Sequence, residues 1–274
     1  MITRFAPSPT GPLHLGHAYS ALTVWRLAAE AGGTALLRIE DLDSERCRPE
    51  FEAGIYEDLR WLGLDWPNPV RRQSDHTADY DAVLDELAAR GLLYPCSCSR
   101  RRIIENGGRP GPEGVVYPGT CRNRPMSDRQ PGDALRLNLA AALEAAGPLP
   151  GFEETGPIHP GRHEIDGAAL VRDFGDPVLQ RRGTGDHVYL VACPHDDAVQ
   201  GVTYVVRGMD LWFATPLFVL LQRLMGWPVP AFHHHDLVRD EAGKRLAKVN
   251  RSRALATYRA EGRTVEDIRR MIGL

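Results

Sequence analysis

The chain has 274 residues, of which 43% are hydrophobic and 25% charged, as in an ordinary globular protein. This length fits one large domain or two modest ones, and the composition excludes a disordered, collagen-like or coiled-coil chain. The formal net charge of -3 excludes a globally basic nucleic-acid-binding protein but permits a local basic patch. The sequence has no apolar run of the roughly 20 residues that a membrane span requires, and no signal-peptide pattern. We therefore expect a cytoplasmic protein, with a monomer as the default.

Five cysteines are too few, and an odd number, for a disulfide framework. Cys96, Cys98 and Cys121 cluster in the sequence, which indicates a metal site or a catalytic role. Cys47 and Cys193 stand apart, and we expect them to be ordinary buried residues.

Basic residues are distributed unevenly. Residues 96–130 hold seven arginines against three acidic residues, a formal local charge of +4 that suits phosphate. Of the 33 basic residues only Lys244 and Lys248 are lysines. Binding phosphate with a compact, mobile point charge is one role in which arginine does not replace lysine equally well.

The first half of the chain alternates strands and helices, which indicates a parallel α/β unit. Each predicted helix ends at a glycine, as helices commonly do. The predicted elements are a strand at 2–6, a Pro-rich turn at 7–12, a helix at about 13–31, a strand at 34–39, helices at about 50–62 and 77–90, and a strand at 92–94.

The second half begins with a break in this rhythm. Between 95 and 167 Pro, Gly and Arg are frequent, which indicates an inserted subdomain. The predicted elements are a helix at 139–146, strands at 188–192 and 202–206, a helix at about 211–225, and two short helical pieces within 249–274.

The segment 6–17 lies between the first strand and the first helix, where nucleotides dock in open parallel sheets. His14 and His17 fall on one face of the first helical turn and are able to donate to a polyphosphate, and Gly16 lets a base pack against the backbone. N–H groups of this helix terminus are expected to bind phosphate as well. The alternative is a histidine pair that only caps the helix.

A second candidate feature is the Gly-led loop 243–248, which carries both lysines of the chain and is suited to stabilise charge on phosphate. The alternative is a solvated basic loop. The three consecutive histidines at 233–235 are not predicted to bind one metal ion, because adjacent side chains of a strand point to opposite faces.

The block His14-Leu15-Gly16-His17 resembles the HIGH motif of class I aminoacyl-tRNA synthetases, and Arg245-Leu246-Ala247-Lys248-Val249 resembles their KMSKS loop. The blocks at 4–11, 38–43 and 206–211 are similar to the catalytic core of glutamyl-tRNA synthetases. In the KMSKS-like loop, Arg245 and Ala247 depart from the pattern, and loss of the hydroxyl removes a hydrogen bond worth about 1 kcal/mol.

Full glutamyl-tRNA synthetases continue into a helical anticodon-binding domain, whereas this chain ends soon after its KMSKS-like loop. It therefore resembles most the glutamyl-queuosine tRNA(Asp) synthetases. The resemblance implies a ligase that activates L-glutamate with ATP and attaches it to the queuosine base of tRNA(Asp).

The resemblance also implies the site residues. ATP and Mg²⁺ would be bound with the help of His14, Gly16, His17 and Lys248, of which the histidines and the lysine have catalytic roles. The residues implied for glutamate are Arg4, Phe5, Ala6, Pro7, Ser8, Glu40, Tyr189 and Arg207. A buried structural salt bridge is the alternative for Glu40 and Arg207.

The spacing Cys96-x-Cys98, then Tyr117-x-x-x-Cys121, resembles the zinc site of that family and implies one structural Zn²⁺. The alternative is two surface thiols and a buried Cys121. The arginines around this site are implied to hold an RNA stem loop by its phosphates; they are Arg100, Arg101, Arg102, Arg122 and Arg124.

The predicted fold class is α/β, with a Rossmann-like parallel-sheet nucleotide-binding domain interrupted by a zinc-containing subdomain and followed by a short helical C-terminal segment. The competing functions are a truncated glutamyl-tRNA synthetase that charges a tRNA 3′ end, a non-catalytic paralogue that binds RNA or glutamate, and an enzyme that joins glutamate to a small amine. The predicted parts are 1–94 and 168–248 for the two halves of the catalytic domain, 95–167 for the insert, and 249–274 for the C-terminal segment.

Overall fold

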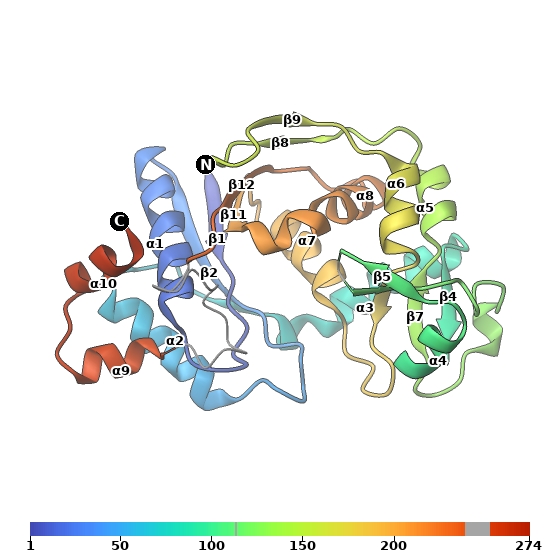
Figure 1. The fold of residues 1–274 in the computed structure, drawn as a ribbon, viewed down its shortest axis with the longest axis horizontal. Coiled ribbons are helices and arrows are strands. Elements are labelled where there is room, and N and C mark those ends of the chain that lie inside the picture. The colour runs from blue at the N-terminus through green and yellow to red at the C-terminus, as the bar shows by residue number, and fades with distance from the viewer. Residues whose placement is uncertain (113, 239–252) are drawn as a thin grey trace.

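A computed structural model describes residues 1–112, 114–238 and 253–274. The N-terminal half is built as the sequence predicts: β1 (Ile2–Phe5) pairs in parallel with β2 (Thr34–Ile39), and α1 (Leu15–Glu30) connects them (Figure 1). After α2 (Pro49–Trp61), the short β3 (Arg71–Arg72) extends the parallel sheet beside β2. The helices end where predicted, since Gly32 and Gly63 both take a positive φ.

The second half of the nucleotide-binding sheet comes from the C-terminal part of the chain. β11 (Tyr204–Gly208) and β12 (Ala231–His235) pair in parallel, and α8 (Thr215–Met225) connects them. The N–H of Thr203 donates to the carbonyl of Ile2 at 2.9 Å, which places β11 beside β1. The carboxyl ends of β1, β2, β11 and β12 therefore lie along one edge.

The insert forms its own antiparallel sheet, with strand order β10-β7-β4. The strand predicted at 92–94 is present but does not join the parallel unit, because its backbone pairs antiparallel with a strand of the insert. The strands and helices of this part are α3 (Thr77–Ala89), β4 (Leu93–Cys96), α4 (Arg100–Glu105), β5 (Arg109–Gly111), β6 (Gly114–Val116), β7 (Ala134–Leu137), α5 (Leu139–Ala146), α6 (Gly167–Phe174) and β10 (Val178–Gln180).

A hairpin links the insert to the nucleotide-binding sheet. It consists of β8 (Phe152–Glu154) and β9 (Gly161–His163), and Glu154 pairs with Phe232 of β12. Figure 1 shows this hairpin along the top of the molecule, between the helices of the insert and the first sheet.

The strand predicted at 188–192 is wrong, because these residues begin the helix α7 (Tyr189–Val199). A short apolar run is compatible with a buried strand or a buried helix, and periodicity alone does not separate the two. The helical spacing places Val191, Ala192 and Cys193 in the interior together with Asp196 and Asp197.

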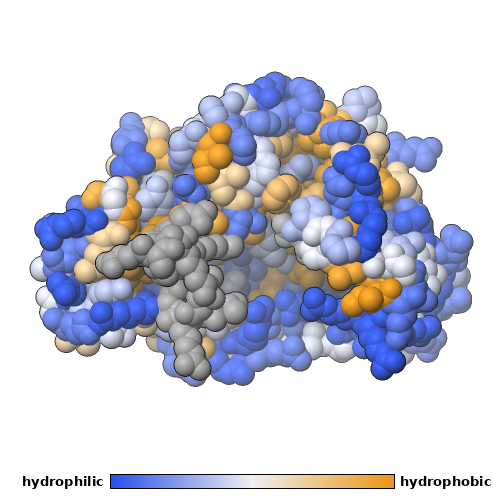
Figure 2. Space-filling view, in the orientation of Figure 1, coloured by the Kyte–Doolittle hydropathy of each residue, from blue (hydrophilic) through white to orange (hydrophobic). Residues whose placement is uncertain are grey.

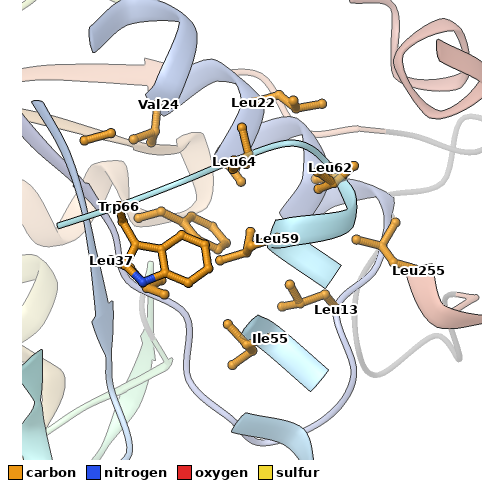
Figure 3. Packing of buried hydrophobic residues seen from close by; sticks show 14 of the residues in the cluster. Leu13, Leu22, Val24, Leu37, Ile55, Leu59, Leu62, Leu64, Trp66 and Leu255 are labelled. Carbon is orange, nitrogen blue, oxygen red and sulfur yellow. The ribbon is translucent and has the colours of Figure 1, made fainter. Parts of the chain in front are cut away.

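Two large apolar cores stabilise the two ends of the molecule. The first lies between α1, α2 and β2, where Ile55, Leu59 and Leu37 gather around Trp66 (Figure 3). The predicted C-terminal helices, α9 (Leu255–Ala260) and α10 (Val265–Ile272), pack against this core. No helix within the described residues is long and apolar enough to cross a membrane.

Candidate active site

A cleft of about 560 Å³ opens at the carboxyl ends of the parallel strands. It lies where β1, β2, β11 and β12 end, as the topology of open α/β sheets requires. Figure 2 shows this face hollowed between two ends that are mainly hydrophilic. Every residue predicted for glutamate or ATP within the described part lines the cleft: Arg4, Phe5, Ala6, Pro7, Ser8, His14, Gly16, His17, Glu40, Tyr189 and Arg207. Lys248 and its loop lie outside the described residues.

His14 and His17 cap the first helix at the edge of this cleft. Nδ1 of His14 accepts from the N–H of Gly16, and Nδ1 of His17 accepts from the N–H of His14, each at 3.1 Å. The capping role that was one alternative is thus present, while both rings also line the cleft. The N–H groups of His17 and Ala18 donate to the carbonyl of His14, so these groups at the helix terminus are already bonded. The histidine rings are therefore better placed to meet a phosphate than these N–H groups.

Arg207 also lines the cleft, near the carboxyl end of β11. Its guanidinium donates from Nη1 to the Tyr189 hydroxyl at 3.1 Å, from Nη2 to Thr215 at 2.7 Å and from Nε to a ring nitrogen of His234 at 3.0 Å. The side chain is only 4% exposed, and no carboxylate of the described residues lies within ion-pair distance of it. A buried cation without a carboxylate is costly unless a ligand supplies the negative charge.

Arg4 differs from Arg207 because a buried ion-pair network already holds it. Arg4 Nε and Arg38 Nη1 both donate to Oδ1 of Asp197 at 2.8 Å. Arg38 also donates to Oε1 of Glu40 at 3.0 Å, so the salt-bridge alternative for Glu40 is present in the structure. Burial raises the pKa of Glu40 above its ordinary value, even though Arg38 and Arg4 oppose this shift.

Sequence reasoning did not find the charges that surround these groups. Asp196 and Asp197 follow the segment 188–192 that was predicted as a strand, and no feature of the sequence indicated that they are buried. The thiol of Cys193, buried as expected, lies beside Arg4 and Arg38, and burial raises its pKa to about 12. Cys47 is only partly buried. Leu42 and Asp43, from the block 38–43, also line the cleft, and further residues line it without a signal in the sequence: Arg46, Gln73, Arg181 and His187.

The three clustered cysteines come together in the insert. The sulfurs of Cys96, Cys98 and Cys121 lie within 4.8 Å of one another and all three residues are buried, so the alternative of surface thiols is wrong. The Tyr117 oxygen lies 3.4 Å from the sulfur of Cys96 and 3.6 Å from that of Cys98, and accepts from the N–H of Cys121 at 2.8 Å.

The pKa values within this cluster are shifted in different directions, since burial raises those of Cys98 and Tyr117. Burial alone would raise the pKa of the Cys121 thiol, but hydrogen bonds from Tyr117 and Cys98 lower it to about 7. Arg136 places its guanidinium carbon 3.9 Å from the centre of the Tyr117 ring and offsets negative charge on the sulfurs and the phenol oxygen. Three thiolates and one oxygen at these positions fit a tetrahedral zinc ion.

Two of the arginines predicted to contact RNA also form ion pairs within the insert. Arg122 pairs with Asp176 at 2.7 Å, and Arg124 pairs with Asp133 at 2.9 Å. The three arginines of α4 (Arg100–Glu105) are exposed, and Arg101 forms a surface pair with Glu105 at 2.7 Å.

Comparison with known proteins identifies a close group of relatives. A model of the catalytic domain of class I tRNA synthetases (E and Q) matches residues 1–122 and 172–274. A Glutamyl-Q tRNA(Asp) synthetase from Rhodobacter capsulatus is 53% identical over 100% of both chains. The Glutamyl-Q tRNA(Asp) synthetase from Nocardia farcinica is 41% identical over 97% of this chain and 81% of that protein.

Solved structures share the fold over most of this chain. A glutamate tRNA ligase from Elizabethkingia meningosepticum, in complex with its amino acid, superposes with a TM-score of 0.68 and 27% identity. The match covers 92% of this chain but 52% of the ligase, so the chain spans about half the length of that protein. Methionyl-tRNA synthetase from Mycobacterium tuberculosis, at 13% identity and a TM-score of 0.61, is similar in fold alone. The molecule thus has the α/β fold of class I synthetases.

Proposed function

The chain belongs to the family of Glutamyl-Q tRNA(Asp) synthetases, which are class I ligases, and we propose that it activates L-glutamate with ATP and transfers the glutamyl group to the queuosine base in the anticodon loop of tRNA(Asp). The observation that carries this proposal is Arg207, a cation 4% exposed that lines the cleft and has no carboxylate partner among the described residues. Glutamate would supply the missing carboxylate, and the Tyr189 hydroxyl, whose oxygen accepts from Arg207, would donate a further hydrogen bond to it. Glu40, at the end of β2, would bind the ammonium group of the substrate.

The first step is transfer of AMP to glutamate. A carboxylate oxygen of glutamate attacks the α-phosphorus of ATP, the bond from that phosphorus to the bridging oxygen breaks, and pyrophosphate leaves with the electron pair. His14, His17 and Lys248 would stabilise the charge that develops on the phosphate oxygens, and Gly16 would pack against the base. Mg²⁺ would supply further positive charge at the phosphates, and Asp210, which lines the cleft, would offer it an oxygen ligand.

In the second step a nucleophilic group of queuosine attacks the carbonyl carbon of the adenylate, and AMP leaves. We assign the exposed arginines of α4 to the RNA backbone. Zn²⁺ would be held by Cys96, Cys98, Tyr117 and Cys121 and would keep the insert folded, away from the chemical steps. The parts 1–94, 95–167, 168–248 and 249–274 are our proposed division of the chain, although the antiparallel sheet of the insert also takes in the start of β4 and the whole of β10, which lie outside 95–167.

The test is transfer of labelled glutamate to tRNA pools with and without queuosine, in the presence of ATP and Mg²⁺, followed by nuclease digestion. We expect label on the anticodon-loop base of tRNA(Asp) and only in queuosine-containing RNA. Arg207→Gln should abolish labelling, whereas Arg26→Gln, which changes an exposed arginine paired with Glu30, should not.

Three other results would each support a competing function. Label on the 3′-terminal adenosine would indicate a truncated charging enzyme. Adenylate without labelled RNA would indicate a small amine as acceptor, and no ATP consumption at all would indicate a non-catalytic paralogue.

A further inference from the structure

Two fully buried residues lie directly behind Arg207. Glu154 ends β8 and His234 lies in β12, and these side chains are 2% and 0% exposed. Glu154 belongs to the hairpin between the two matched segments, so it lies outside the residues that match the model of the class I catalytic domain. The family comparison therefore assigns no role to it.

Hydrogen bonds define the proton positions in this pair. Oε1 of Glu154 accepts from the backbone N–H groups of His234 at 2.8 Å and Gly156 at 2.6 Å, and Oε2 lies 2.5 Å from Nδ1 of His234. Because a carboxylate accepts, Nδ1 carries the ring proton. Nε2 then presents its lone pair, which accepts from Nε of Arg207 at 3.0 Å.

The surroundings keep this arrangement in one charge state. Burial lowers the pKa of His234, which holds the ring neutral. Burial alone would raise the pKa of Glu154, but its hydrogen bonds from the ring and backbone of His234 lower it below the ordinary value, so the carboxylate stays ionised. Gly156 allows the close approach, since a Cβ at this position would lie 2.3 Å from the carbonyl oxygen of His234.

We propose that Glu154 and His234 are positioning residues that hold Arg207 through a neutral acceptor, so that its positive charge remains for a carboxylate of the substrate. A carboxylate in direct contact would neutralise Arg207, as Asp197 does for Arg4. The imidazole instead orients the guanidinium without pairing its charge. This inference rests on the proposed function, in which Arg207 binds glutamate.

Four variants test the pair by glutamate-dependent exchange of pyrophosphate into ATP, with glutamate binding measured by calorimetry. His234→Phe removes the acceptor and should raise the KM for glutamate by at least about tenfold, with the KM for ATP within about twofold of wild type. His234→Gln keeps an acceptor for Arg207 and should restore most of the affinity. Glu154→Gln places an amide N–H against Nδ1, favours the opposite tautomer, and should raise the KM for glutamate in the same direction.

The matched control is His233→Phe, since His233 is the neighbouring residue on β12 and does not line the cleft. It should leave both KM values unchanged. A glutamate KM for His234→Phe and Glu154→Gln within about twofold of wild type would overturn the proposal. If His234→Phe does not fold, the nearly isosteric Glu154→Gln decides alone. Absence of glutamate binding in the wild type would instead overturn the proposed function itself.

Discussion

At the scale of single residues, Asp58 of α2 is a carboxyl group that the fold tolerates poorly. It is 2% exposed, and Arg259 of α9 lies 3.3 Å from its Oδ1 without forming a hydrogen bond. Burial raises its pKa from 3.8 to about 6. Because the folded-state pKa lies above the unfolded one, the stabilising contribution of Asp58 is complete below pH about 4 and is lost as the pH rises through 6.

Asp58→Asn should therefore stabilise the protein at pH 8, by on the order of 2 kcal/mol, and have little effect at pH 4. Urea unfolding at several pH values measures the difference. Glu50→Gln, at an exposed position of the same helix, is the control and should change the free energy of unfolding by no more than about 0.5 kcal/mol at pH 8. A gain for Asp58→Asn that stayed constant between pH 4 and pH 8 would contradict the assigned cause.

At the scale of the elements, prediction succeeded where local signals agree with tertiary structure. α1, α2 and α8 have apolar residues at helical spacing and end at glycines, and β2 is a short apolar run. Each of these elements could therefore be predicted from its own residues. The cleft was also predictable, because the parallel strands place Arg4, Glu40 and Arg207 at one edge. The charges around Arg4 were not predictable, since α7 gives no local sign that Asp196 and Asp197 pair with arginines more than 100 residues away.

The buried ion pairs that Asp197 of α7 forms are expected to contribute strongly to the stability of the fold. Asp197→Asn removes the carboxylate shared by two buried guanidinium groups and should lower the free energy of unfolding by about 3–5 kcal/mol. Asp79→Asn is the matched control, because Asp79 pairs with Arg71 at a site where its side chain is 46% exposed, and should cost less than about 1 kcal/mol. Equal losses of stability in denaturant unfolding would show that the buried network adds nothing beyond a surface pair.

At the scale of the whole molecule, the cleft and the cysteine cluster belong to different cores. The core between α1, α2 and β2 supports the nucleotide end of the cleft, whereas the cluster around Tyr94, Ile103 and the three cysteines forms a small separate core in the insert. Figure 1 shows these parts toward opposite ends of the molecule. A core this small, in which three of the seven buried residues are cysteines, contributes little apolar burial and depends on cross-links.

Removal of metal should therefore loosen one end of the molecule and spare the other. After chelation of the zinc-loaded protein, amide hydrogen exchange should accelerate by at least about tenfold over residues 96–121 and stay unchanged in β1, α1 and β11. Affinity for glutamate, measured by calorimetry, should persist, because the residues of the cleft lie outside the cluster. Uniform acceleration across both ends would instead mean that the metal stabilises the whole fold, and unchanged exchange at 96–121 would mean that the cysteines and Tyr117 pack without it.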